Sequence, residues 1–167
     1  MSISKNDRKT LLKSQQGELD AVLMYNALAD VVRDAEDAET FRVLAAEEGR
    51  HAAVFRGLTQ QILTPGKTKA VLLPLLYRAI GKKRLYPLIA KGEYSAENTY
   101  APVAEKYPEV QSVKEDEKRH GDTVLALLRE TEGNAPSGKA ILAGVGVVLT
   151  AAAILCLKKS RNKIKTI

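Results

Sequence analysis

Two glutamate–histidine pairs constrain this chain more than any other feature. Both have the spacing Glu-x-x-His: Glu48 with His51, and Glu117 with His120. Each pair lies in an apolar stripe whose steps alternate three and four residues, which is the spacing of a helix-packing seam. Because residues three apart on a helix point the same way, the sequence predicts two helices that each carry a carboxylate and an imidazole into the core.

Two further seams each carry one glutamate, Glu18 in the first and Glu93 in the third. Nowhere does an alternation of period two persist, so an all-α fold is expected. The four long helices are expected at about residues 4–34, 37–63, 84–107 and 108–130.

A long connection separates the second predicted helix from the third and contains an apolar stretch, residues 71–80. Four long helices with one long central connection predict a bundle of the crossover type. We expect the apolar stretch to form a crossover helix that packs on the bundle. The alternative is a helix at a membrane surface, with Lys82, Lys83 and Arg84 facing lipid headgroups.

A bundle of this kind would bring the acidic and imidazole groups of the four seams to one centre. Four carboxylates and two imidazoles suit two divalent iron ions, or manganese. Without metal, four buried glutamates would repel one another and resist ionisation. The neighbouring acids Glu47, Glu115 and Asp116 are expected to be solvated. The predicted ligands are Glu18, Glu48, His51, Glu93, Glu117 and His120.

The net charge of +6 belongs to the C-terminal part of the chain. Residues 139–167 contain six basic residues and no acidic one, out of 26 basic and 20 acidic residues in total. Residues 1–138 are therefore neutral overall, which removes the main support for a nucleic-acid-binding function. No secretory signal peptide is recognisable at the N-terminus.

An uncharged segment, residues 140–157, predicts a transmembrane helix followed by a basic tail, residues 158–167. The predicted organisation is a bundle over 1–132, a linker over 133–139, the membrane helix and the tail. The basic tail favours a cytoplasmic C-terminus, whereas the missing signal peptide favours a cytoplasmic bundle. We expect a single-pass C-terminal anchor with the bundle in the cytoplasm.

Four motifs together resemble the ferritin-like superfamily, and most closely rubrerythrin: GELDAVLMY at 17–25, EGRHAAVF at 48–55, KGEYSAENTYAP at 91–102 and DEKRHGDTVLALL at 116–128. The resemblance covers about residues 10–132. It implies that the six predicted ligands hold two irons, and that the chain forms a homodimer. Proteins of this kind reduce hydrogen peroxide or oxygen, or oxidise ferrous iron.

The chain departs from the rubrerythrin pattern at three points. Where rubrerythrin has a further glutamate, three residues after Glu93, this chain has Ala96; Glu97 follows it and is a candidate seventh ligand. Only one cysteine, Cys156, is present, so no four-cysteine iron centre can form. Electrons are therefore expected from an external donor or from free ferrous iron. The third departure is the predicted membrane helix.

The predicted function is a membrane-tethered di-iron oxidoreductase acting on hydrogen peroxide, oxygen or ferrous iron. The alternative is a module that binds iron at the membrane and delivers it without significant turnover. Tyr25 and Tyr100 lie on the seams near the predicted site and could donate a hydrogen bond or an electron there. The other interpretation is that both are ordinary core tyrosines.

Overall fold

The computed structural model describes residues 3–129, which form five helices and, within that range, no strand. The all-α prediction is confirmed for this part of the chain. The helices are α1 Lys5–Ala29, α2 Ala35–Thr59, α3 Thr68–Ile80, α4 Lys82–Ala104 and α5 Val110–Ala126.

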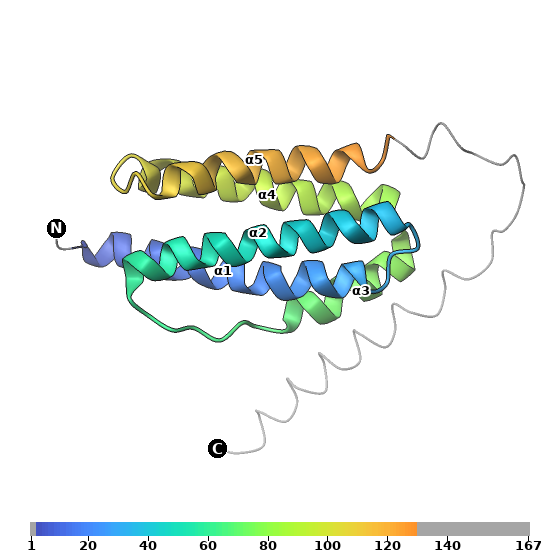
Figure 1. The fold of residues 1–167 in the computed structure, drawn as a ribbon, viewed down its shortest axis with the longest axis horizontal. Coiled ribbons are helices and arrows are strands. Elements are labelled where there is room, and N and C mark those ends of the chain that lie inside the picture. The colour runs from blue at the N-terminus through green and yellow to red at the C-terminus, as the bar shows by residue number, and fades with distance from the viewer. Residues whose placement is uncertain (1–2, 130–167) are drawn as a thin grey trace, which may run out of the picture. The chain divides into compact units, whose positions relative to one another are not determined.

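Four long helices form two hairpins, α1 with α2 and α4 with α5, which pack side by side (Figure 1). The first turn lies earlier than expected. Helix α1 ends at Ala29 because Asp34 caps α2, its side chain accepting the Glu36 N–H at 3.0 Å. Helix α2 likewise ends at Thr59 rather than near residue 63, because Gln60 takes a left-handed conformation with φ 56°.

The connection from α2 to α3 runs back along the bundle (Figure 1) and is fixed to α1 by hydrogen bonds. The Gln15 amide donates to the Gln61 carbonyl at 2.9 Å, and the Gly66 N–H donates to Asp20 Oδ1 at 2.6 Å. These polar residues on α1 place α3 against the bundle, so the predicted crossover helix is confirmed.

Helix α3 is apolar on both sides. Leu73, Leu76 and Ile80 pack against the core, whereas Val71 and Leu75 are exposed. A single residue, Gly81, separates α3 from α4. Its φ of 71° lies in the left-handed region that favours glycine, and α4 consequently begins at Lys82, slightly earlier than the sequence predicted.

The apolar core is divided into two clusters, and the polar seam residues lie between them along the bundle. One cluster contains Tyr25, Phe41, Tyr86 and Val124; the other contains Leu11, Phe55, Tyr100 and Val113. The polar residues between them are therefore shielded from water at both ends.

In residues 3–129, none of the helices is long and apolar enough to cross a membrane. The predicted linker, membrane helix and basic tail lie outside the described residues.

Candidate metal centre

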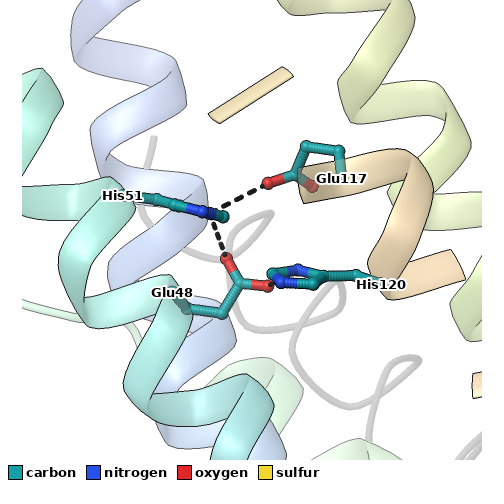
Figure 2. A group of neighbouring side chains, drawn as sticks. All are labelled: Glu48, His51, Glu117 and His120. Carbon is teal, nitrogen blue, oxygen red and sulfur yellow. Dashed lines mark hydrogen bonds and ion pairs between the residues drawn. The ribbon is translucent and has the colours of Figure 1, made fainter. Parts of the chain in front are cut away.

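The two Glu-x-x-His pairs meet at the centre of the bundle (Figure 2). Glu48 and His51 come from α2, Glu117 and His120 from α5, and all four side chains are buried. One potential ligand atom from each residue lies within 4.8 Å of the others. The helical spacing therefore does what the sequence predicted: it delivers both pairs to one place.

Within this cluster, the Nδ1 atoms of both histidines face carboxylates. His51 Nδ1 lies 3.2 Å from Glu117 Oε1 and 3.6 Å from Glu48 Oε2. His120 Nδ1 lies 3.1 Å from Glu48 Oε1. The two rings stack with centroids 5.2 Å apart. Glu48 thus lies between the two imidazoles.

The outer nitrogens of the histidines bind acids from the opposite helix. His51 Nε2 lies 3.1 Å from Asp116 Oδ2 on α5, and His120 Nε2 lies 2.8 Å from Glu47 Oε2 on α2. Arg119 joins these acids, at 2.7 Å from Asp116 and 3.1 Å from Glu47. The expectation that Glu47 and Asp116 are merely solvated is wrong.

These outer contacts orient both imidazole rings. An Nε2–H that donates to a carboxylate leaves the Nδ1 lone pair for a metal, which is the usual arrangement at metal-binding histidines. The sequence does contain the signal, since Glu47 and Asp116 each stand directly before the glutamate of a Glu-x-x-His pair. Glu115 differs, since it is exposed and bonds only Gln111 among the described residues, as expected of a solvated acid.

Glu18 on α1 and Glu93 on α4 are buried beside the cluster. Both lie close enough to the carboxylates of Glu48 and Glu117 for these to raise their pKa values. All six predicted ligands are therefore gathered in one region, although only two of these four glutamates belong to the tightest group of four.

Two tyrosines hold these glutamates from the opposite hairpin. The Tyr100 hydroxyl on α4 donates to Glu18, and the Tyr25 hydroxyl on α1 donates to Glu93 Oε1 at 2.5 Å. Both tyrosines are buried. The two hairpins thus exchange equivalent contacts across the centre.

Burial raises the pKa of Glu18 well above its usual range, and the nearby carboxylate of Glu48 raises it further. Burial and the carboxylates of Glu48 and Glu117 do the same to the pKa of Glu93. Burial would also raise the pKa of Glu48, but hydrogen bonds from Glu18 and from both histidines outweigh burial and lower it. Without metal, Glu18 and Glu93 therefore hold their protons to a higher pH than ordinary glutamates.

Burial on its own would lower the pKa of His51, but the carboxylates of Glu117 and Glu48 outweigh it and raise the pKa to about 10. Burial is likewise outweighed at His120, whose pKa is raised mainly by Glu48. Without metal, both imidazoles therefore carry protons that balance the charge of the carboxylates.

Three buried atoms have no hydrogen-bond partner: Glu48 Oε2, His51 Nδ1 and Glu117 Oε1. All three belong to the cluster, and His51 Nδ1 lies within ion-pair distance of both oxygens, as the dashed lines in Figure 2 show, yet none of the three makes a hydrogen bond. Unsatisfied buried polar atoms are costly, so their convergence indicates a place for a cation. The oxygen and imidazole donors suit iron or manganese.

A cavity of about 300 Å³ reaches the centre between α1, α3 and α4. Its floor includes Glu18 and Glu93, and its walls are mainly apolar. Ala96 lines this cavity, whereas Glu97 is half-buried and belongs neither to the cavity nor to the cluster. The structure does not bring Glu97 to the other ligands, and its assignment as a seventh ligand stays a prediction.

A helical bundle of the crossover type with a buried carboxylate and histidine cluster defines a protein of the ferritin-like di-metal class, and the cluster fits a di-iron centre. The family model for rubrerythrin matches residues 9–128, so the chain belongs to the rubrerythrin family. No curated protein and no solved structure shows significant similarity to the chain.

Proposed function

We propose that this protein is a di-iron oxidoreductase that reduces hydrogen peroxide or oxygen, tethered to the membrane by residues 140–157 with its bundle in the cytoplasm. The convergence of unsatisfied donor atoms from Glu48, His51 and Glu117 carries the proposal for the metal site. Membership of the rubrerythrin family supports the redox chemistry. The uncharged run at 140–157 supports the tether.

The chain's residues have distinct parts in this function. Glu48 and Glu117 lie in the middle of the cluster and would bind both metals, whereas Glu18 with His51 and Glu93 with His120 would each complete one metal's ligands. Two ferrous ions held there would supply the two electrons that peroxide reduction needs. Tyr25 and Tyr100 orient the outer glutamates by donating hydrogen bonds to them.

The surroundings of the cluster favour a small substrate. Apolar clusters close both ends of the polar layer, and the cavity beside α3 offers a route for a molecule the size of peroxide or oxygen. Water exclusion strengthens the electrostatic interactions of a charged site. These features also suit oxidation of ferrous iron that enters by the same route.

The proposal is tested by loading the full-length chain with ferrous iron under anaerobic conditions and counting the bound metal. The loaded protein is then mixed with peroxide or with oxygen, and iron oxidation is followed by stopped-flow absorbance. We expect two irons per chain, both oxidised in one fast phase. The Glu117→Ala variant should lose binding, whereas Glu115→Ala, which changes an exposed acid on the same helix, should retain it.

The rates separate the candidate functions. Faster oxidation by peroxide identifies a peroxidase, and comparable oxidation by oxygen identifies a ferroxidase. Tight, reversible iron binding without turnover would instead support the alternative of an iron-delivery module. Failure of the folded chain to bind iron would contradict the metal site itself.

A further inference from the structure

Four aromatic rings form a continuous series from the metal cluster towards the surface. Tyr25 stacks on Phe41 with centroids 5.6 Å apart, Phe41 meets Tyr86 edge-on at 5.3 Å, and Tyr86 stacks on Tyr77 at 6.4 Å. The chain has only eight aromatic residues, six tyrosines and two phenylalanines, so half of them belong to this series. Core packing alone does not require so many of the aromatic residues to lie in one series.

The inner end of the series touches the metal cluster. The Tyr25 hydroxyl donates to Glu93 Oε1 at 2.5 Å. Tyr86, the next tyrosine outward, donates to Asp37 Oδ2 at 2.6 Å, and Asp37 is buried and paired with Lys82 at 3.1 Å. Each buried tyrosine of the series therefore has a carboxylate that can receive its phenolic proton.

The outer end opens into a surface hollow of about 440 Å³, lined by Val31, Arg33, Tyr77, Arg78 and Gly81. Tyr77 is half-buried, and its hydroxyl accepts a hydrogen bond from the Arg33 backbone N–H at 3.3 Å. Across residues 3–129, neither arginine of the hollow forms an ion pair with a carboxylate. The hollow therefore combines a half-buried tyrosine with two exposed arginines that form no ion pair within the described residues.

The other half of the bundle contains no such series. Tyr100 donates to Glu18 and meets Phe55 at 5.2 Å, but Phe55 is fully buried and contacts no further aromatic ring in the described part of the chain. The metal ligands come in matched halves, whereas only the Tyr25 side continues to the surface. An asymmetric path is therefore not a consequence of the symmetric ligands.

We propose that Tyr77, Tyr86, Phe41 and Tyr25 form an electron path, by which an anionic one-electron reductant bound between Arg33 and Arg78 supplies an electron for peroxide reduction at the metal centre. This inference rests on the proposed redox function. The short separations between rings favour electron transfer because electronic coupling falls steeply with distance. Phe41 is not itself oxidised and serves as a bridge between the two buried tyrosines.

When only one ferrous ion is bound, the path supplies the second electron that peroxide reduction needs. Conversion of one hydrogen peroxide to two waters takes two electrons and two protons from solvent. Bound ferrous iron would supply one of these electrons. Tyr25 gives the other, while its proton passes along its hydrogen bond to Glu93. Tyr86 then reduces the Tyr25 radical and passes its own proton to Asp37, and Tyr25 recovers its proton from Glu93.

The last steps return the path to its resting state. Tyr77 reduces the Tyr86 radical, Asp37 returns the proton to Tyr86, and Tyr77 releases its proton to solvent. An anionic donor such as ascorbate then gives one electron and one proton to the Tyr77 radical. Tyr86 therefore passes the electron from Tyr77 to Tyr25 and ends each cycle with its hydroxyl again bonded to Asp37.

The path is tested by trapping the radical at its outer end. The full-length chain, loaded with only one ferrous ion per chain, is mixed with peroxide and the spin trap methylnitrosopropane without reductant, and adducts are located by peptide mass spectrometry. We expect an adduct on Tyr77 in the wild type and its loss in Tyr86→Phe. The matched control is Tyr94→Phe, because Tyr94 lies on α4 like Tyr86 but outside the path, and its hydroxyl donates to Asp122 on α5. This variant should retain the adduct.

Iron content and iron oxidation, measured on the same samples, separate the two possible failures. If iron is bound and oxidised but Tyr77 carries no adduct, or if Tyr86→Phe retains it, the path is contradicted and the metal centre stands. If no iron is bound or oxidised, both the proposed function and the path fail. Electron paramagnetic resonance of frozen samples should show the radical retained nearer the centre in Tyr86→Phe.

The docking site is tested through charge. Arg78→Glu should slow reduction of the Tyr77 radical by ascorbate but leave its reduction by the neutral donor hydroquinone unchanged. Lys9→Glu makes the same charge change on an exposed residue near the start of α1, and should leave both rates unchanged. Equal slowing of both donors in Arg78→Glu, or equal slowing by ascorbate in Lys9→Glu, would contradict a specific anion site.

Discussion

At the scale of single residues, Glu47 and Asp116 orient a cluster to which they do not belong. Each binds the outer nitrogen of a histidine on the opposite hairpin, and Arg119 holds the two acids together. A histidine held this way keeps one ring orientation and becomes a stronger ligand. The acids therefore contribute to metal affinity without touching the metal.

Glu47→Gln should weaken iron binding by about 10- to 100-fold, because the amide cannot supply the negative charge that faces His120 Nε2. The affinity is measured by anaerobic competition with a coloured chelator. Glu115→Gln provides the matched control, since it alters an exposed acid outside these contacts. An affinity equal to that of the wild type would show that the outer contact has no effect on the ligand.

The site was only partly predictable from the residues. Glu48, His51, Glu117 and His120 could be placed together because helical spacing fixes their direction within each helix. The contact of Glu47 with His120 could not be predicted. It depends on how closely α2 and α5 approach each other, which helical spacing does not determine. Ala96 lines the cavity and Glu97 does not. This difference also depends on how the helices pack, so the sequence alone did not predict it.

At the scale of elements, helix ends depend on local competition that seam spacing does not reveal. Asp34 fits the end of α1 by seam spacing, yet it caps α2 instead. Gln61 fits the continuation of α2, yet its carbonyl binds Gln15 on α1. The crossover helix was predictable because its apolar residues need a partner surface, and α1 provides one.

Gly81→Ala tests the junction between α3 and α4. A Cβ at Gly81 would meet no atom within 4 Å, so the cost comes only from the backbone φ of 71°. We expect a loss of about 1–2 kcal/mol in the free energy of unfolding, measured by chemical denaturation. Gly57→Ala is the control, because it also meets no atom within 4 Å but lies inside α2 without a positive φ. Unchanged stability in Gly81→Ala would contradict a strained junction.

Asp37 links α2 to α4 through Lys82 and Tyr86. Asp37→Ala should lower the free energy of unfolding by about 3 kcal/mol, because it leaves a largely buried ammonium and a buried hydroxyl without their partner. Thermal or chemical denaturation measures the loss. Glu39→Ala, at an exposed residue two positions along α2, should change stability little; equal losses in the two variants would contradict the link.

At the scale of the whole molecule, two helical hairpins present matching groups to one centre. Glu18 matches Glu93, and the two Glu-x-x-His pairs match each other. This repetition made the fold and the ligands predictable together. The aromatic series could not be predicted, because Phe41 and Tyr86 belong to opposite hairpins and meet only through tertiary packing.

Metal binding should release protons, and iron affinity should rise with pH. In the metal-free protein, the raised pKa values of Glu18, Glu93, His51 and His120 keep these groups protonated to a higher pH than usual. Iron displaces these protons, so a higher pH favours binding until each group has lost its proton; for His51 this occurs at a pH of about 10. Calorimetry in buffers of different ionisation enthalpy counts the protons, and binding without proton release would contradict this account of the empty centre.

The central claim is that two irons lie among Glu18, Glu48, His51, Glu93, Glu117 and His120. The most direct test is anomalous diffraction at the iron absorption edge, from crystals of the chain grown with ferrous iron under anaerobic conditions. The account predicts two anomalous peaks at the centre of the bundle, within bonding distance of both histidine Nδ1 atoms. A single peak, or none there in crystals that contain iron elsewhere, would contradict it.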